Sequence, residues 1–579
     1  MIKKLAACLR QYKKNTVYTI ILVTLEVIMD VMIPMLMAKL IDLGINAKNM
    51  DHILKIGMFL TLSVVLSLIF GTLSAKYASV AAAGFARNVR KDMYYEVQDY
   101  SFANIDKFST ASLVTRLTTD VSNVQNAFQI IIRVALRSPV MLVFSMFMSF
   151  SINRHVSLIF VCIIPFLAVA LYIIVSKVHP IFTRVFHAYD KLNSTVQENL
   201  RGIRVVKSFV REDYEVKKFR MASNTIYKEF RKAEKILALN GPFMQLSMNA
   251  SMLLIAWFGA KLIIGSSMTT GELTSILSYA MQILFSLMLL SVVFVTITMS
   301  RASAKRIVEV LEEVPDLTNG SSSVNQVEDG SISFCNVSFS YIKDKNKLSL
   351  KNINLTIESG ETVGIIGGTG AAKTSLVQLI PRLYDVTEGT ISVGGVNVRD
   401  YNIHTLRDEV AMVLQKNTLF SGTVKENLRW GCENASDEEL VRVCKLAQAD
   451  DFIHTFPDGY DTYIEQDGSN VSGGQKQRLC IARALLKKPK ILILDDSTSA
   501  VDTKTDAYIR KAFRDEIPHT TKIIISQRIS SVEDADKIVI MDSGSIDAIG
   551  THEELLRNNT LYYELYNSQM KGGTSHETK

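Results

Sequence analysis

The sequence has little cysteine, and the few cysteines are scattered along the chain. There are six among 579 residues, at positions 8, 162, 335, 432, 444 and 480. No two of them have the CxxC spacing that zinc and redox sites use, so the sequence suggests neither a zinc site nor a disulfide framework. Reduced thiols in the cytosol are the expectation.

Charge is missing from long parts of the first half. Four segments contain no Asp, Glu, Lys or Arg, namely residues 56–75, 156–175, 241–260 and 273–300. Each is long enough to cross a hydrocarbon core of about 30 Å as a helix. Residues 16–41 and 128–152 are further candidates, although both contain charged residues. We therefore expect six membrane spans, followed after about residue 305 by a soluble second half.

Positive charge is concentrated on one side of these spans. The segment before the first span and the connections from about 84 to 127 and from about 178 to 239 are rich in Lys and Arg. The opposite loops are short and nearly bare of charge, so the amino terminus, both long connections and the second half are expected to be cytoplasmic. Anionic membrane lipids account for the net charge of +7, and no nucleic-acid partner is expected.

The two long connections are expected to be helices that continue out of the membrane. Residues 184–200 and 210–235 are dense in charge at helical spacing. Two shorter pieces, Ser101–Thr119 and Glu198–Phe209, are candidate contact elements for the soluble half. The alternative, that these pieces only cap the ends of helices, has equal weight from the sequence.

Two acidic residues stand out in the first span. Glu26 and Asp30 are four residues apart, which places them on one helix face and about 6 Å apart along the axis. Acidic groups at such depth usually face the interior of the helix bundle or a water-filled cavity. They are either a site for cationic substrates or protons, or partners of Arg133 or Arg137 in the third span.

A glycine-rich octet marks the chemistry of the second half. Gly367–Thr374 reads GGTGAAKT, follows the short apolar strand at Glu361–Ile366 and leads into a helical pattern. Backbone N–H groups of such a loop wrap nucleotide phosphates. Lys373 is expected to reach the β- and γ-phosphates of ATP, and the Thr374 hydroxyl is expected to bind Mg²⁺.

Ala372 departs from the usual phosphate loop, which has a glycine before the lysine. A methyl group is tolerated there if the residue has helical dihedral angles, so we expect only a modest weakening of nucleotide binding.

Two further residues, Asp496 and Gln527, predict slow hydrolysis of ATP. Asp495 ends the buried-strand pattern ILILD and is suited to hold Mg²⁺ through water. An efficient ATPase has glutamate next, as the general base, and Asp496 is one methylene shorter; such a base contributes about 10²–10⁴ in rate. Gln527 stands where such an ATPase has a switch histidine, and an amide cannot take a proton. Both changes favour a site that binds ATP and turns it over slowly.

The full set of motifs resembles an ATP-binding-cassette (ABC) exporter half-transporter. The six spans are followed by GGTGAAKT, Gln415 in VLQKNTLF, VSGGQKQR, ILILDD, SAVD and SQR, so the resemblance covers about residues 1–565. It implies an all-α six-helix transmembrane domain of the type IV exporter fold, followed by an α/β P-loop ATP-binding cassette domain. The expected boundaries are 1–310 for the transmembrane domain, 311–330 for a linker, 331–567 for the cassette and 568–579 for a polar tail.

The resemblance also implies roles for individual residues. Tyr341 matches the aromatic residue that stacks on adenine, and Gln415 matches the residue that links the γ-phosphate and Mg²⁺ to the membrane domain. Asp502 matches a residue of the loop between the two nucleotide sites. The expected nucleotide-binding set is Tyr341, Gly367, Gly368, Thr369, Gly370, Ala371, Ala372, Lys373, Thr374 and Ser375, with Ser472, Gly473, Gly474 and Gln475 serving ATP held by the opposite subunit.

The weakened residues lie in the chain's own half-site, whereas its VSGGQ run is intact. This is similar to the weak-site subunit of heterodimeric bacterial multidrug exporters. The resemblance implies a multi-pass protein of the bacterial inner membrane that works with a second half-transporter carrying the catalytic Glu and His, and that exports small amphipathic compounds. A peptide or lipid exporter, an importer on the same architecture, or an ATP-gated regulator without net pumping are the alternatives.

Overall fold

The computed structural model describes residues 1–319 and 324–573, which form two compact units. The first unit holds Met1–Gln98 and Ser109–Glu313. The second holds Asp99–Phe108 and the described residues from Val314 onward. Residues 320–323 of the predicted linker and residues 574–579 of the predicted polar tail lie outside the described residues.

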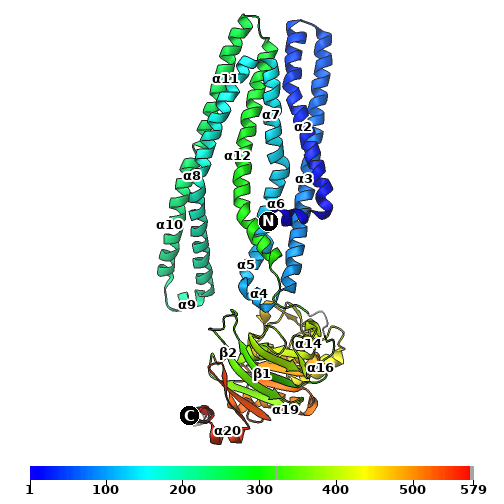
Figure 1. Ribbon diagram of the computed structural model, residues 1–579, viewed down its shortest axis with the longest axis vertical. Helices are drawn as coiled ribbons and strands as arrows, with labels where there is room; N and C mark the ends of the chain where they lie inside the picture. Colours follow the sequence, from blue (N-terminus) through cyan, green and yellow to red (C-terminus); the bar gives the residue numbers. More distant parts are fainter. Residues whose placement is uncertain (320–323, 574–579) are drawn as a thin grey trace. The chain divides into compact units, whose positions relative to one another are not determined.

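The first unit is helical, and six of its described helices are long and apolar enough to cross a membrane (Figure 1). These stretches are Arg10–Asn46, Met50–Asp99, Thr110–Ile152, Arg154–Phe182, Glu212–Ile264 and Thr270–Glu312. Each predicted span lies inside one of them, so the six-span prediction is confirmed. A helix satisfies its own backbone polar groups, which is the condition for crossing hydrocarbon.

The helices of this unit are α1 (Ile2–Ala7), α2 (Lys13–Lys39), α3 (Met50–Asp99), α5 (Thr110–Thr115), α6 (Val121–Ile130), α7 (Leu136–Ile152), α8 (Arg154–Arg201), α9 (Ile203–Ser208), α10 (Glu212–Leu237), α11 (Asn240–Ile264) and α12 (Thr270–Glu312). A short 3₁₀ turn occupies Arg10–Tyr12, and wider π-helical turns occupy Leu40–Asn46, Arg116–Asp120 and Ile131–Ala135. Side-chain caps set three of the helix starts, and Ser109 accepts from the Ser112 backbone amide at α5. Asn153 accepts from the His155 and Val156 amides at α8, and Thr269 forms a capping box at α12.

The long helices α8 and α10 lie side by side beyond their apolar stretches (Figure 1). Arg184 Nε lies 2.9 Å from Glu229 Oε2, and Lys218 Nζ lies 2.7 Å from Glu198 Oε2. The helices predicted over 184–200 and 210–235 are therefore confirmed. Gly202 ends α8, and the short helix α9 turns the chain back, so Glu198–Phe209 forms the tip of this helical pair.

The other candidate contact element, Ser101–Thr119, is divided between the two units. Its first part, Ser101–Phe108 with helix α4 (Phe102–Lys107), belongs to the second unit, and the part from Ser109 onward belongs to the first. Tyr384 Oη donates to Asp106 Oδ2 at 2.7 Å, and the rings of Phe102 and Tyr384 are 6.1 Å apart. Helix α4 therefore makes contacts with the nucleotide-domain sequence, beyond capping a helix end.

The acidic residues of the first span pair with an arginine of the third. Arg137 Nη2 lies 2.8 Å from Asp30 Oδ2 and 3.4 Å from Glu26 Oε1. Ser67 Oγ also donates to Asp30 Oδ1 at 2.5 Å, and Ser74 Oγ donates to Glu26 Oε2 at 3.4 Å. The structure thus favours the helix-pairing interpretation of Glu26 and Asp30, with Arg137 as the partner.

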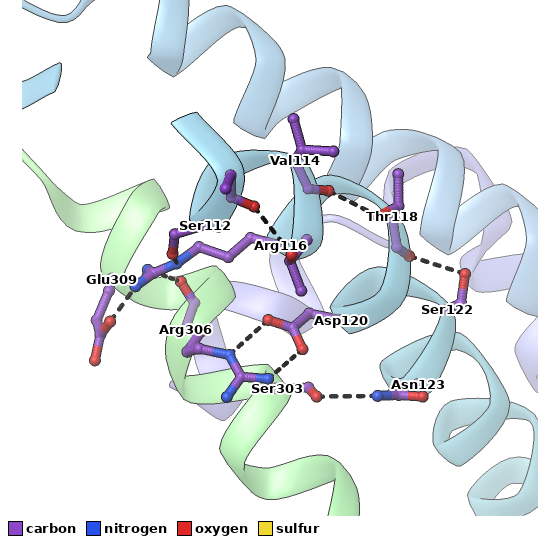
Figure 2. Close-up of polar contacts among 12 residues, drawn as sticks. Ser112, Val114, Arg116, Thr118, Asp120, Ser122, Asn123, Ser303, Arg306 and Glu309 are labelled. Atoms are coloured by element: carbon purple, nitrogen blue, oxygen red, sulfur yellow. Dashed lines mark hydrogen bonds and ion pairs between the residues drawn. The ribbon is translucent and has the colours of Figure 1, made fainter. Parts of the chain in front are cut away.

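A second polar network joins the π-helical turn Arg116–Asp120 to the end of α12 (Figure 2). Asp120 is fully buried, and its carboxylate accepts from Arg306 Nε at 2.7 Å and from Arg306 Nη2 at 2.5 Å. Arg116 Nη1 donates to the Arg306 carbonyl at 2.7 Å and lies 3.1 Å from Glu309 Oε2. Two-pronged arginine–carboxylate pairs are among the stronger polar contacts in proteins, so this network fixes α12 against the third span.

The second unit is an α/β domain with two main sheets. A six-stranded sheet has the order β12-β11-β3-β10-β9-β6 and is parallel except for β12, and a four-stranded antiparallel sheet has the order β2-β1-β4-β5. The strands are β1 (Ile332–Phe339), β2 (Leu350–Ile357), β3 (Thr362–Gly367), β4 (Glu388–Val393), β5 (Val396–Asn397), β6 (Val410–Val413), β7 (Gly422–Thr423), β8 (Tyr463–Ile464), β9 (Ile491–Asp495), β10 (Thr521–Ile525), β11 (Lys537–Asp542) and β12 (Ser545–Gly550).

The helices of the second unit, apart from α4, are α13 (Lys373–Gln378), α14 (Ile403–Glu409), α15 (Val424–Arg429), α16 (Asp437–Leu446), α17 (Asp450–His454), α18 (Gly473–Leu486), α19 (Thr503–Glu516), α20 (His552–Asn558) and α21 (Thr560–Gly573). Strands β3 and β9 flank β10 and run parallel to it. Their carboxyl ends therefore open at one edge of the sheet, which is where ligands bind in open α/β sheets.

Replacing Arg306 should destabilise the first unit more than replacing Asp120. Arg306→Met strands a carboxylate with no exposed surface, whereas Asp120→Asn leaves an arginine whose side chain is 45% exposed. We expect Arg306→Met to cost about 3–5 kcal/mol, because an unpaired buried charge is expensive, and Asp120→Asn to cost clearly less. Thermal unfolding of the detergent-purified variants measures the difference.

The double variant Asp120→Asn/Arg306→Met is the matched control. It contains no stranded charge, so it should unfold at a higher temperature than Arg306→Met alone. Equal losses from the two single variants would contradict an explanation based on the buried carboxylate.

Candidate functional site

The phosphate-loop sequence connects β3 to α13. The loop runs from Gly368 to Ala372, and Gly370 has a φ of +86°, a conformation that favours glycine. Lys373 Nζ donates to the carbonyls of Gly367 at 2.8 Å and Gly368 at 3.0 Å. Burial lowers the pKa of the Lys373 ammonium, and nearby carboxylates partly oppose that shift. The ammonium group therefore binds the first carbonyls of its own loop.

Ala372 does not have the helical dihedral angles on which the sequence expectation depended. It caps the start of α13 with φ 67° and ψ 26°, in the left-handed region. The loop must reverse there to enter the helix, and glycine does this without strain. A side chain with a Cβ costs about 1–2 kcal/mol in this conformation. The alanine therefore strains the loop more than the sequence suggested.

The two aspartates at the end of β9 have different surroundings. Asp495 is buried and accepts from Thr374 Oγ1 at 2.8 Å. Burial raises the pKa of Asp495, and the bond from Thr374 opposes this shift. Asp496 follows at a left-handed φ of 48°, and burial raises the pKa of its carboxyl. The structure thus joins Thr374 to Asp495 by a hydrogen bond, and Gln415 and Asp496 line the same cavity.

This donor set fits Mg²⁺ held together with a nucleotide. The ion prefers hard oxygen ligands, keeps several waters and takes few ligands from the protein. Within the described residues there is no group of three or more His, Cys, Asp and Glu side chains that could hold a metal. A hydroxyl at Thr374, an amide at Gln415 and a carboxylate at Asp495 leave most positions to phosphate oxygens and water.

Tyr341 lies just after β1 and beside α13. Its Oη is 2.8 Å from Ser375 Oγ and donates to Gln378 Oε1 at 3.3 Å. The Tyr341 ring meets the Tyr384 ring edge-on at 5.1 Å. The tyrosine is half-buried and keeps part of its surface exposed, as a residue that stacks on a nucleobase requires.

A cavity of about 480 Å³ brings most of these residues together. It is lined by Thr369, Gly370, Ala371, Ala372, Lys373, Thr374, Ser375, Gln415, Asp495, Asp496 and Gln527, and also by Leu348, Ser349, Ile525, Ser543 and Gly544. The sequence interpretation missed Leu348, Ser349, Ile525, Ser543 and Gly544. Only the turn-forming run Asp542–Gly544 could have drawn notice, because none of the five was part of a motif assigned to nucleotide binding.

The Ser-Gly-Gly-Gln run lies apart from this cavity, at the start of α18. Ser472 Oγ accepts from the backbone N–H of Gln475 at 3.3 Å, and Gln475 Oε1 accepts from the backbone N–H of Ser472 at 2.9 Å. A Cβ on Gly474 would lie 2.8 Å from the Ala500 carbonyl oxygen, so that position has no room for a larger residue. The run is therefore a capped helix start that packs closely against Ala500 and is separate from the chain's own phosphate loop.

A second cavity of about 540 Å³ lies in the first unit. Its wall is rich in methionine, with Met141, Met244, Met248, Met281 and Met288. Arg137, Ser138, Gln245 and Gln282 are polar residues on the same wall. The Ser138 hydroxyl is buried and has no hydrogen-bond partner among the described residues. Methionine-lined surfaces adapt to ligands of different shape.

A six-span helical unit followed by a P-loop domain defines a membrane protein coupled to ATP. Comparison with known families gives the same class. Residues 16–303 match the family described as "ABC transporter transmembrane region", and residues 350–499 match the family described as "ABC transporter". The chain therefore belongs to the ABC transporters and has the exporter fold, with a transmembrane region and an ATP-binding domain.

Similar proteins align over nearly the whole chain. An uncharacterized ABC transporter ATP-binding protein of Bacillus subtilis, YfiB, is 36% identical over 98% of this chain and 98% of its own length. The Bacillus subtilis protein YknU is 34% identical over 83% of each chain. An ATP-dependent lipid A-core flippase of Desulfotalea psychrophila is 32% identical over 87% of this chain and 89% of its own.

Replacing the strained alanine should stabilise the second unit. Ala372→Gly removes a left-handed residue with a Cβ, although glycine gives the unfolded chain more freedom. We expect a net gain of about 0.5–1 kcal/mol, seen as a higher midpoint of thermal unfolding without nucleotide. We also expect tighter binding of a fluorescent ATP analogue.

Ala371→Gly is the matched control, one residue earlier in the same loop. Ala371 is buried and does not have a positive φ, so its loss should destabilise the unit by about 1 kcal/mol. If both variants destabilise the protein equally, the conformation of Ala372 carries no cost.

Proposed function

We propose that this chain is one subunit of an ATP-driven exporter in the inner membrane of a bacterium, and that its own nucleotide site binds ATP but hydrolyses it slowly. A second half-transporter carrying the catalytic Glu and His completes the machine. The observation that carries the proposal is the contrast between Asp496 and Gln527, which are weak for proton transfer, and an intact, capped Ser472–Gln475 run.

The chemistry of the site supports slow turnover. Mg²⁺ bound with ATP neutralises phosphate charge, and Thr374, Gln415 and Asp495 are the residues that would hold it, the last through water. Lys373 and the loop amides bind the phosphates, and Tyr341 stacks on the adenine. Asp496 carries the shorter carboxylate, and Gln527, which lines the same cavity, offers only an amide to the reacting water. Binding groups are therefore complete, and the proton-accepting groups are poor.

The position of Ser472–Gln475, which we call the signature run, supports an arrangement of two subunits. Ser472, Gly473, Gly474 and Gln475 do not line the chain's own cavity. As the family resemblance implies, they serve ATP held on the partner. ATP that binds the closed pair more tightly than the open pair would then drive the change between inward-facing and outward-facing states.

The membrane cavity supports an amphipathic substrate. Its five methionines offer an adaptable apolar wall, and Arg137, Ser138, Gln245 and Gln282 supply polar contacts on the same wall. Lipid export is the second candidate function, because two relatives carry the name "ATP-dependent lipid A-core flippase". Reconstituted vesicles distinguish the two: uphill accumulation of a dye supports the first, and movement of a labelled lipid between leaflets supports the second.

The proposed division of labour predicts unequal effects of two substitutions. The tagged chain is purified from its host together with its partner, and ATP hydrolysis by the pair is measured. Asp496→Asn should reduce turnover only mildly, because it changes the slow site, whereas Ser472→Arg should nearly abolish turnover by blocking the partner's site. The chain purified alone should hydrolyse ATP slowly.

A gain of function tests the same idea in the opposite direction. Asp496→Glu/Gln527→His in the chain alone should raise turnover, up to the range of about 10²–10⁴ that a positioned general base contributes. Rapid turnover by the unsubstituted chain alone, or a severe loss in Asp496→Asn, would show that the sites have been assigned the wrong way round.

The acidic residues of the first span should act through helix packing. Glu26→Gln/Asp30→Asn leaves Arg137 without its charged partners, so we expect poor assembly and an equal loss of transport of cationic and neutral dyes. Adding Arg137→Gln should restore part of the assembled protein, measured by size-exclusion chromatography. A loss confined to cationic dyes, in a well-assembled variant, would indicate instead that the acids contact substrate.

A further inference from the structure

The switch position is held by a residue from the far end of the chain. Gln569, on the last described helix α21, places its side-chain amide across the loop that follows β10. Its Nε2 donates to the Gln527 carbonyl at 2.8 Å, and its Oε1 accepts from the Ile529 amide at 2.9 Å. One side chain thus fixes the backbone on both sides of Arg528, directly beside the cavity that Gln527 lines.

Helix α21 is itself anchored, so Gln569 does not hang from a loose end. Tyr562 has no exposed surface, and its Oη is 2.7 Å from His552 Nδ1. Asn559 accepts from the Tyr562 amide at 2.9 Å and donates to Asp547 Oδ2 at 2.7 Å. Gln569 lies seven residues after Tyr562, about two helical turns, and therefore shares its face of the helix.

We call residues 526–530, which follow β10, the switch loop. From there the polar contacts continue to the loop that precedes α19. Arg528 Nη1 donates to the Val501 carbonyl at 3.1 Å, and Nη2 donates to the Ser499 carbonyl at 3.0 Å. The Ser499 hydroxyl in turn donates to the Asp496 carbonyl at 2.9 Å. The switch loop and the residues after Asp496 are therefore joined by hydrogen bonds.

The chain of contacts ends on the signature helix α18. Gln477 is buried there, and its Nε2 donates to Ser499 Oγ at 3.2 Å while its Oε1 accepts from the Ala500 amide at 3.0 Å. Gln477 is two residues after Gln475, in the first turns of the helix that Ser472 caps. A continuous path of hydrogen bonds thus links α21, the switch loop, the loop before α19 and the signature run.

We propose that Gln569 is a positioning residue for ATP turnover: it holds the switch loop, and through Arg528 and Ser499 it holds the signature helix in register. The role of the signature run at a partner's site rests on the proposed function above. Gln569 itself touches neither nucleotide nor reacting water. Its loss therefore leaves ATP binding intact and lowers the rate of the step that needs both loops in place.

Three variants of the full chain, purified with its partner in lipid nanodiscs, test this assignment. Gln569→Ala removes both contacts. Gln569→Glu keeps an acceptor for the Ile529 amide but loses the donor to the Gln527 carbonyl. Ser568→Ala changes the adjacent exposed residue of α21 and is the matched control.

Gln569→Ala should lower kcat by about three- to tenfold, the range expected from the loss of one or two hydrogen bonds, with KM for ATP unchanged. Gln569→Glu should lie between this variant and the parent, and Ser568→Ala should match the parent. Amide hydrogen exchange should accelerate over residues 526–530 in Gln569→Ala and remain slow at Ile529 in Gln569→Glu. The midpoint of thermal unfolding should fall only slightly in Gln569→Ala, in line with two lost hydrogen bonds, and the other two variants should stay close to the parent.

An unchanged kcat, or a parallel change in kcat, KM and unfolding midpoint, would overturn the assignment, since the second pattern is that of a damaged fold. The test is separable from the proposed function. If the unsubstituted chain alone proves to be fast, the weak-site proposal fails, and the effect of Gln569→Ala is then measured as the ratio of rates in that homodimer.

Discussion

A charge that leaves water needs a partner close by, and this requirement shapes the membrane unit. Asp120 has no exposed surface and is held by both arms of the Arg306 guanidinium (Figure 2). In a second arrangement, Arg137 of the third span pairs with Glu26 and Asp30 of the first span. Each arrangement joins helices that are distant in sequence. The pairing of Arg137 lies within the predicted spans, and in hydrocarbon, where apolar side chains gain little from burial against one another, such contacts and close packing decide which helices meet.

The fold could be read from the sequence because its signals are local. Twenty-residue stretches without charge predict membrane spans. The glycine-rich run at Gly367–Thr374 and the strand before it predict a phosphate loop without any information from the rest of the chain. The pairing of Asp30 was only half accessible. Its depth required a partner, but Arg133 and Arg137 were equal candidates, and only the rotation of the third span places Arg137 within 2.8 Å. A π-helical turn at Ile131–Ala135 changes that rotation, and no residue pattern in the sequence predicted this turn.

The candidate site shows the same division. Motifs predicted a common location for Lys373, Thr374 and Asp495, and the structure places all three on one cavity, although their roles in binding stay predictions. The dihedral angles of Ala372 could not be predicted from the sequence, because closure of the loop, and not the residue type, imposes the left-handed conformation. The contacts of Gln569 could not be predicted either. A lone glutamine 42 residues from the backbone that it holds belongs to no motif.

Helix α4 lies in sequence between membrane helices but belongs to the nucleotide-binding unit, where Asn104 Nδ2 donates to the Val314 carbonyl at 3.0 Å. The polypeptide therefore passes between the units three times, after Gln98, after Phe108 and after Glu313. Two of these passages enclose a ten-residue insert, Asp99–Phe108. A recombination event at the linker alone would pair a new cassette with an insert shaped for the old one. Exchange of cassettes between such proteins therefore requires matched changes at two separate places in the gene.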